Sequence, residues 1–425
     1  MIPLRAARSP KLIAYLLLGS AAMLAALATG HGELVAVGVP FLIVLTWTLT
    51  IPRPALSGTA AAAPELLTEG GAVTTEVRLQ SRGTPHRMEL RTSLVAATGE
   101  IVGTAVDTLP LSRRRVATAL AVSCPQLGRY GVPSVDLFAE DVFGVLAFTG
   151  HIDLARTVRV YPAAELLPSP PAPRHTQLRT GNHRSRARGD GIEYAGTREF
   201  VPGDHIRRVN ARLSSRSPSL QVNEHVPERN TDIVLLLDTF TDLREAGRSS
   251  LAAAAHAVAS LADVYLAERD RVGFAEFGGI VRWLLPGSGR MQLARILEAL
   301  LDARLRLHYA WTGIDRLPPQ LLPPNAFVIA VSPLIDGRTR QLVLDLWARR
   351  RDTAVLELSP LAFMPRPTGR KEALARRAWA VERRAERREL RSLGIAVGEW
   401  TYGEPLVEVI QDLDHFRRAS AVPRR

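Results

Sequence analysis

The stretch Ile233-Val234-Leu235-Leu236-Leu237-Asp238 is an apolar run closed by one carboxylate, as expected for a strand buried on both faces of a parallel sheet. Residues 326–331 and 354–358 have the same character. Helices are predicted between these runs at residues 251–267, 292–301 and 340–350. A pair of strands is predicted at residues 271–277 and 280–284. This alternation of strands and helices predicts a Rossmann-like α/β domain over residues 231–418.

Two uncharged apolar runs, residues 12–29 and 34–51, open the chain. Each has about the 18–20 residues that a helix needs to cross a membrane, so residues 1–54 predict a two-helix transmembrane hairpin. Four basic residues flank the pair: Arg5, Arg8 and Lys11 before the first run, and Arg53 after the second. The short connector between the two runs has no Lys or Arg. The positive-inside rule then predicts a multi-pass protein of the plasma (inner) membrane with its globular region in the cytoplasm. A cleaved signal peptide is the alternative, but it leaves the second run unexplained.

Period-two alternation follows an Ala-rich linker at residues 55–64, for example in Val73-Thr74-Thr75-Glu76-Val77-Arg78-Leu79. Gly and Pro interrupt these runs at short intervals, so residues 55–161 predict a small antiparallel β-sandwich. Residues 162–191 are rich in Pro and Arg and predict a mobile linker. The predicted chain is therefore multidomain, with residues 192–230 standing between the linker and the α/β domain.

The formal net charge of the chain is +12. Nucleic acid, an anionic leaflet and an acidic partner protein are all compatible with this excess. Cys124 is the single cysteine, so an intramolecular disulfide and a Cys-based zinc site are excluded. It stands in an apolar run and is predicted to be a buried core thiol.

A charged helix is predicted over residues 370–391, with a thin apolar stripe of Leu374, Ala378, Val381 and Ala385. Its remaining surface is predicted to be a strongly basic outer face made by Arg383, Arg384, Arg387, Arg388 and Arg391. We interpret this face as solvated, and contact with the inner leaflet or a partner is the alternative.

The segment Pro202-Gly203-Asp204 has the chemistry of a tight turn, because Pro fixes φ and Gly is free to take a positive φ. Four charged residues lie around it: Arg198, Asp204, Arg207 and Arg208. They predict a buried ion network that docks the segment onto the α/β domain, and a partner-binding surface is the alternative.

Residues 193–228 resemble the signature of a bacterial family, domain of unknown function 58 (DUF58). The similarity rests on Gly196-Thr197-Arg198-Glu199-Phe200-Val201-Pro202-Gly203-Asp204, on Ile206-Arg207-Arg208-Val209-Asn210 and on Val222-Asn223-Glu224, with shorter matches along the whole chain. Ala211 stands where the family usually has Trp. The signature residues to which we assign a partner-binding or structural role are Arg198, Pro202, Gly203, Asp204, Arg207, Arg208 and Asn210.

The resemblance implies a von Willebrand A-like domain after the signature and partnership with a MoxR-type AAA+ ATPase, without enzymatic activity. Domains of this type often carry magnesium on an Asp, two hydroxyls, a later Thr and a second Asp. Asp238 and Thr312 match two of these ligands, whereas Phe240 and Asp242 occupy the hydroxyl positions and Pro333 stands where the second Asp belongs. We therefore predict a degenerate site of Asp238, Asp242 and Thr312 without a metal or other cofactor. Asp238 is predicted to be a helix N-cap, and a magnesium site is the alternative.

These observations predict a non-enzymatic, membrane-anchored interaction or adaptor protein, whose partners are the lipid bilayer and an AAA+ ATPase in envelope-related or complex-assembly processes. The alternative is a hydrolase or metal-dependent ligand-binding protein that uses the crevice near Asp238, with Asp242, His205 and His225 as further candidates. No Ser–His–acid or metal-ligand spacing supports it. No Gly-rich phosphate loop follows the first strand, and no small-molecule substrate is identified. Nucleic-acid binding rests on charge alone and is not predicted.

Overall fold

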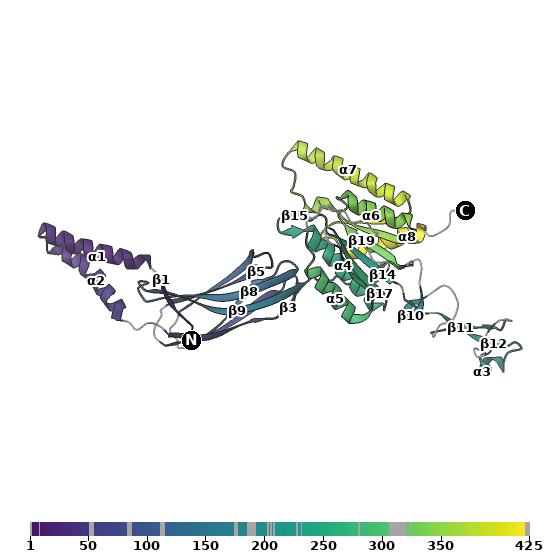
Figure 1. Cartoon of the computed structure of the whole chain (residues 1–425), viewed down its shortest axis with the longest axis horizontal. Coiled ribbons are helices and arrows are strands. Elements are labelled where there is room, and N and C mark those ends of the chain that lie inside the picture. Colours follow the sequence, from purple (N-terminus) through teal and green to yellow (C-terminus); the bar gives the residue numbers. More distant parts are fainter. Residues whose placement is uncertain are drawn as a thin grey trace. The chain divides into compact units, whose positions relative to one another are not determined.

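The computed structural model describes residues 2–7, 9–50, 55–82, 87–110, 115–173, 177–184, 193–201, 204, 206, 209–226, 228–230, 232–278, 281–305, 320–323 and 325–420. The chain divides into two units, Met1–Tyr161 and Pro162–Arg425, which are described separately below (Figure 1).

Two apolar helices open the first unit, α1 (Pro10–Thr29) and α2 (Glu33–Thr50). They pack against each other: the rings of Tyr15 and Phe41 meet edge to face at 5.3 Å, and a side chain at Gly38 would lie 3.2 Å from the carbonyl oxygen of Gly19. Helix α1 is long and apolar enough to cross a membrane. The same test is passed by α4 (Ser250–Ala267), but that helix is mostly buried and belongs to the core of the second unit.

A β-sandwich forms the rest of the first unit. Its larger sheet has the order β1-β9-β8-β5-β6, with β3 paired to β9, and its smaller sheet has the order β2-β4-β7. The strands are β1 (Arg5–Ala7), β2 (Ala55–Ala63), β3 (Leu66–Thr68), β4 (Ala72–Arg82), β5 (Arg87–Ala96), β6 (Ile101–Pro110), β7 (Arg115–Ser123), β8 (Gly128–Glu140) and β9 (Ala147–Tyr161). Inward-facing residues of both sheets, such as Leu56, Val77, Leu90 and Leu137, share one core. Cys124 is buried in the neighbouring core cluster.

Two features of this unit differ from the sequence prediction. The segment predicted as an Ala-rich linker is the strand β2, because its Ala residues pair along β4 and Leu56 enters the core. The residues before α1 form β1, which pairs antiparallel with β9, and Ile2 is buried among core residues. The chain before α1 and the chain after α2 therefore meet in one sheet.

The second unit is built on a six-stranded sheet of order β18-β17-β14-β19-β20-β21. All neighbouring pairs are parallel except β17 and β18, which form the predicted antiparallel edge pair. The strands are β14 (Asp232–Asp238), β17 (Arg271–Phe277), β18 (Arg282–Gly287), β19 (Phe327–Ser332), β20 (Asp352–Leu358) and β21 (Ala396–Trp400). Every residue of β14 is buried, as its apolar sequence predicts.

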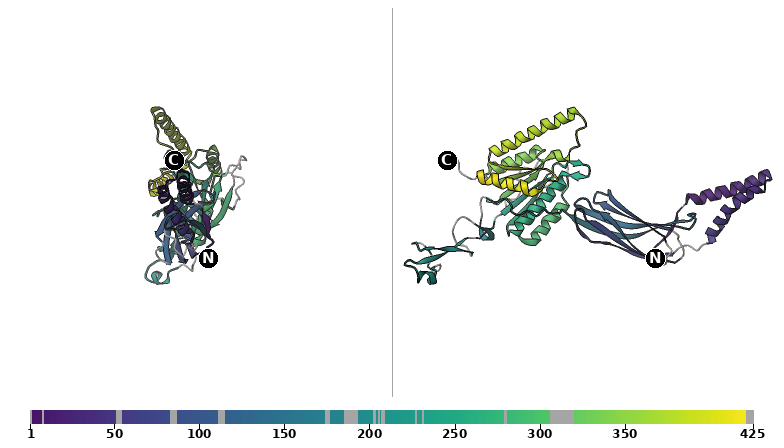
Figure 2. Two further views of the ribbon diagram at one scale, coloured as in Figure 1. Left: turned by 90° about the vertical axis from the view of Figure 1, so that its left-hand side faces the viewer. Right: turned by 180° about the vertical axis from the view of Figure 1, so that it is seen from behind.

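Helices cover both faces of this sheet (Figures 1 and 2). They are α4, α5 (Gly289–Leu301), α6 (Gly337–Ala348), α7 (Arg370–Ser392) and α8 (Leu406–Ser420), with a 3₁₀ turn η3 at Pro360–Phe363. On one face, Val234 and Leu236 of β14 pack with Leu346 of α6 and Leu390 of α7. The chain is thus a multidomain protein with an apolar N-terminal helix and two β-sheet-based units.

The part of the predicted mobile linker that the structure describes up to residue 173 is held against the α/β domain. The amide of Glu165 donates to Ser260 Oγ at 2.9 Å, and its carboxylate accepts from the amide of Leu406 at 3.0 Å. Tyr265 Oη donates to the carbonyl of Pro171 at 2.8 Å, and Arg417 donates to the carbonyl of Ala172 at 3.0 Å. This segment is a strap across α4 and α8 rather than a free linker.

The signature segment contains β11 (Glu193–Glu199), β12 (Gln221–Val226) and the short helix α3 (Ala211–Ser214). β11 and β12 pair antiparallel, and β10 (Gln177–Arg184) pairs with β13 (Glu228–Asn230) at the flanks. A two-residue strand pair, β15 (Arg244–Glu245) and β16 (Arg248–Ser249), precedes α4.

Candidate functional site at the carboxyl edge of the parallel sheet

Asp238 ends β14 and is buried, with 3 % of its surface exposed. Its Oδ1 accepts from the amide of Phe240 at 2.8 Å, whereas Oδ2 accepts from Ser332 Oγ at 2.5 Å and from Thr339 Oγ1 at 2.8 Å. Burial raises the pKa of Asp238, and these three hydrogen bonds oppose the rise. The prediction that Asp238 caps a helix is wrong: it closes a local turn and joins the ends of β14 and β19 to α6.

The helix caps at this edge come from other residues. Ser249 is the N-cap of α4, and Asp242 supports it by accepting from Ser249 Oγ at 2.6 Å and from the amide of Leu251 at 3.1 Å. Arg244 Nε also donates to Asp242, at 2.6 Å. Oδ1 of Asp242 therefore holds the start of α4, where an acceptor is stabilised by the free helix amides, whereas Oδ2 accepts from Arg244 of β15.

The guanidinium of Arg338 lies beside the residues of the predicted degenerate metal site. Arg338 places its guanidinium 3.9 Å from the ring centroid of Phe240 and donates to both oxygens of Asp336, at 2.8 and 2.6 Å. Hydrogen bonding to Asp336, together with the charges of Asp336 and Asp238, raises the pKa of Arg338. The same hydrogen bonds lower the pKa of Asp336, which also caps α6. Phe240 packs edge to face on Phe277 at 5.5 Å.

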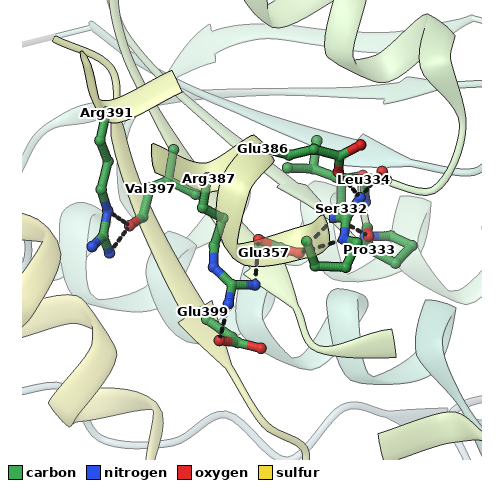
Figure 3. A network of polar contacts seen from close by, with 10 residues as sticks. Ser332, Pro333, Leu334, Glu357, Glu386, Arg387, Arg391, Val397 and Glu399 are labelled. Carbon is green, nitrogen blue, oxygen red and sulfur yellow. Dashed lines mark hydrogen bonds and ion pairs between the residues drawn. The ribbon is translucent and has the colours of Figure 1, made fainter. Parts of the chain in front are cut away.

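A second polar cluster continues along the same edge (Figure 3). Glu357 of β20 is fully buried and accepts from Arg383 at 2.5 Å and from Arg387 at 3.2 Å. Arg383 also donates to the carbonyls of Pro333 and Leu334, and Arg387 pairs with Glu399 at 2.6 Å. Toward the amino end of β21, Arg391 donates to the carbonyl of Val397. Burial raises the pKa of Glu357 and the two guanidiniums oppose it. These contacts fix α7 to the ends of β19, β20 and β21.

This cluster corrects the prediction for α7. Arg383 and Arg387, predicted on an outer basic face, are turned inward, and the residues of the predicted apolar stripe are exposed. The sequence interpretation missed Arg383 because its acceptor, Glu357, stands inside an apolar strand 26 positions away. A buried carboxylate in such a strand is the one signal that calls for a cationic partner.

The signature residues form a second candidate site. Arg198 makes a two-pronged pair with Asp204, with both N–O distances at 2.6 Å, and Asp204 also accepts from the amide of Val201 at 2.9 Å. The pair is partly exposed rather than buried. Asn210 caps α3 and donates to Asn223 Oδ1 at 2.8 Å. Pro202, Gly203, His205, Arg207 and Arg208 lie outside the described residues, as does Thr312.

Apolar side chains are exposed on this same segment. Ile206 is 82 % exposed, and Val201, Leu213 and Leu220 are also exposed. Among the described residues of the signature, polar contacts hold Arg198, Val201 and Asp204 together, whereas several apolar side chains are exposed and available for contact. The structure brings together Arg198 and Asp204, and it places Asn210 in a separate hydrogen-bonded pair.

The residues at Asp238 do not fit a magnesium site of the implied kind. Both oxygens of Asp238 accept hydrogen bonds. Oδ1 of Asp242 holds the start of α4 and Oδ2 accepts from Arg244, while the guanidinium of Arg338 lies on Phe240. An incoming dication would have to break these bonds and approach a cation. Within the described residues, no three His, Cys, Asp or Glu side chains gather as a metal-binding group.

We therefore predict that isothermal titration of the purified full chain with Mg²⁺ or Mn²⁺ shows no micromolar binding. The matched control is Asp238→Ala, which removes the one carboxylate that occupies the first ligand position. Micromolar affinity in the native chain that is lost in Asp238→Ala would contradict the prediction and establish a cation at this edge.

The fold and these two clusters define a doubly wound α/β domain that carries an additional signature segment. Residues 196–337 match the family model described as protein of unknown function DUF58, which confirms the DUF58 resemblance. No curated protein matches the chain.

Solved structures resemble the chain only distantly. The CARDB domain of the PF1109 protein from Pyrococcus furiosus is 13% identical, with a TM-score of 0.17, over 26% of this chain and 91% of that one. The C-terminal domain of wzt is 12% identical, with a TM-score of 0.19, over 26% of this chain and 80% of that one. Cwp6 from Clostridium difficile is 8% identical, with a TM-score of 0.19, over 71% of this chain and 37% of that one. Similarities this low carry no argument about function.

Proposed function

We propose that this protein is a non-enzymatic, membrane-anchored adaptor whose signature segment binds a MoxR-type AAA+ ATPase. The observation that carries the proposal is the signature itself, in which the Arg198–Asp204 pair fixes a turn beside exposed apolar residues such as Ile206. A segment whose backbone is fixed and whose apolar side chains are exposed is suited to binding another protein.

The α/β domain supports an interaction role of the von Willebrand A type. Its strand order, with one antiparallel edge strand beside five parallel ones, is compatible with such a domain. Asp238 is buried and hydrogen-bonded through both oxygens, so it is poorly placed to serve a hydrolase as a base or nucleophile. We assign the edge of the sheet a structural role and the signature the binding role.

The membrane anchor is proposed to be a hairpin with both ends on one side. Strand β1, which precedes α1, pairs with β9, which follows α2. If α1 and α2 cross a bilayer, they therefore do so an even number of times. Basic residues before α1 favour the cytoplasm for the paired strands and the globular region, in the plasma (inner) membrane. A cleaved signal peptide is disfavoured because cleavage after α1 would remove β1 from its sheet.

The test is affinity purification of the tagged full chain from detergent-solubilised membranes, with and without ATP. We expect nucleotide-sensitive recovery of a MoxR-type ATPase. Asp204→Lys should lower that recovery by about tenfold, equivalent to about 1.4 kcal/mol of binding free energy. Glu404→Lys, a charge reversal at another exposed residue of the same unit, is the matched control and should leave recovery unchanged.

The exchange of both partners, Arg198→Asp with Asp204→Arg, separates two roles of the pair. Restored recovery would assign the pair to holding the turn, whereas persistent loss would mean that the ATPase contacts these charges directly. Recovery of lipid and generic contaminants alone, in cells that express the ATPase, would contradict the adaptor function.

A further inference from the structure

Helix α7 turns Arg383 and Arg387 toward the sheet and leaves the apolar stripe of Leu374, Ala378, Val381 and Ala385 on its outer face. Arg383 is 7 % exposed and contacts Glu357, whereas Leu374 and Val381 are 56 % and 62 % exposed. Ala378, between these two, and Ala385, four residues after Val381, are also exposed. The guanidiniums on the inward face bind acceptors in the domain: Arg387 donates to Glu357 and Arg391 donates to the carbonyl of Val397. The apolar stripe lies on the opposite face of the helix.

The stripe has the spacing of a coiled-coil seam. Leu374, Ala378, Val381 and Ala385 are separated by four, three and four residues, which places Leu374 and Val381 at d positions and the two Ala residues at a positions. Small residues at a let a second helix approach closely. Residues 374–385 span about 18 Å, since each helical residue rises 1.5 Å. Arg388 occupies the next d position and ends the seam.

Charges beside the seam select the partner and its direction. Arg377 and Arg384 occupy successive g positions, and Glu382 and Glu389 occupy the e positions five residues after each. In a parallel pair of identical helices, g of one helix faces the following e of the other, so Arg377 meets the partner's Glu382 and Arg384 meets the partner's Glu389. In an antiparallel pair, g faces g and e faces e, which would oppose like charges.

We propose that α7 is a self-association surface that pairs in parallel with α7 of a second copy of this chain. The arrangement is two-fold symmetric, so each contact occurs twice. Glu389 already pairs with Arg340 at 2.6 Å in the single chain, so the Arg377–Glu382 contact contributes most of the selectivity. A seam of two heptads is weak alone, and pairing strengthens where copies are concentrated on one membrane. The inference does not depend on binding of the ATPase.

Position-specific cross-linking of the full chain in cells tests the inference. Leu374→Cys and Ala385→Cys are made separately and treated with a short membrane-permeant bismaleimide. The native chain, with only the buried Cys124, gives the background, and Arg290→Cys, an exposed position on α5, controls for random collision. We expect a covalent dimer at both 374 and 385, about fivefold above both controls.

Orientation is decided by the same two variants. If the helices paired antiparallel, cells that express both variants would give a dimer linked between Cys at 374 and Cys at 385. Neither variant expressed alone would then give a dimer. A helix lying on an anionic bilayer, or bound to a different protein, would give no dimer at all. Each of these outcomes overturns the proposal.

A charge exchange then tests the selection rule without altering the inward face. Arg377→Glu in the Ala385→Cys background places a carboxylate opposite the partner's Glu382, and we expect the dimer yield to fall about threefold. Adding Glu382→Arg restores the opposite-charge pairing and should restore the yield. Both residues are exposed, so neither change burdens folding. A dimer yield that stays the same in Arg377→Glu and in the double variant would contradict the parallel g–e pairing.

Discussion

Replacement of Arg383 with alanine is expected to lower the free energy of unfolding of the α/β domain by about 3–5 kcal/mol. The change leaves Glu357, which is fully buried, with Arg387 as its remaining cationic partner. It also removes the donors to the carbonyls of Pro333 and Leu334. A buried charge that loses its partner keeps its desolvation cost without compensation, which is why this loss exceeds that of an exposed ion pair.

Arg384→Ala is the matched control for this prediction, because Arg384 is the exposed neighbour on the same helix. Its replacement should change the free energy of unfolding by less than about 0.5 kcal/mol. Urea unfolding of the full chain followed by tryptophan fluorescence measures both, since five of the six Trp residues lie in the second unit. Equal effects of the two substitutions would contradict the inward orientation of α7.

The sheet of the second unit could be predicted from its sequence because the strands are apolar on both faces. β14, β19 and β20 are central strands between two layers of helices, so nearly every residue in them is buried. Such strands appear in the sequence as continuous apolar runs. The antiparallel edge pair of β17 and β18 followed from two short runs close together in the chain. In these elements, local pattern and tertiary environment agree.

Helix α7 shows where the same reasoning fails. Its charged and apolar faces are evident in the sequence, but the pattern alone does not say which face packs inward. The face was decided by Glu357, a carboxylate whose burial requires cationic donors and which is remote in sequence. The strap at residues 162–173 was missed for a related reason, since its bonds to Ser260, Leu406 and Tyr265 are made by backbone atoms and one carboxylate.

The candidate site followed the sequence in part. Departure from the implied metal ligands was visible at Phe240 and Pro333, but the substitute cation Arg338 was not, because it follows from the position of α6 relative to Phe240. Asp238 was expected to cap a helix, whereas the hydroxyls of Ser332 and Thr339 reach it from the end of β19 and from α6. Partners brought together by parallel strands are separated in sequence by about a hundred residues, so spacing cannot reveal them.

Replacement of Asp238 should show that this carboxylate stabilises the fold through its hydrogen bonds and not through its charge. Asp238→Ala removes three of them and leaves the hydroxyls of Ser332 and Thr339 buried, so we expect a loss of about 2–4 kcal/mol in the free energy of unfolding. Asp238→Asn keeps an acceptor for the amide of Phe240, and its amide group can donate to the two hydroxyls. We expect it to lie within about 1 kcal/mol of the native chain at neutral pH.

The free energy of unfolding should depend on pH differently in the native chain and in Asp238→Asn. Burial raises the pKa of Asp238 in the folded state above its value in the unfolded chain, so the folded protein holds this proton more tightly. The resulting stabilisation is fully present below about pH 4 and is lost as pH rises through the folded-state pKa. Stability of the native chain relative to Asp238→Asn should therefore fall from about pH 4 upward, by about 1.4 kcal/mol per pH unit within that window.

Urea unfolding at a series of pH values measures this difference, and other carboxylates cancel because both proteins share them. A native chain that instead gains stability over Asp238→Asn as the pH rises would mean that the ionised form of Asp238 is the favoured one in the folded state. That result would mean either that the three hydrogen bonds to Asp238 outweigh its burial or that a cation lies close to the carboxylate, and the Mg²⁺ titration described above distinguishes the two. A falling difference would assign the end of β14 to the architecture of the domain and concentrate the search for partners on the signature segment and on α7.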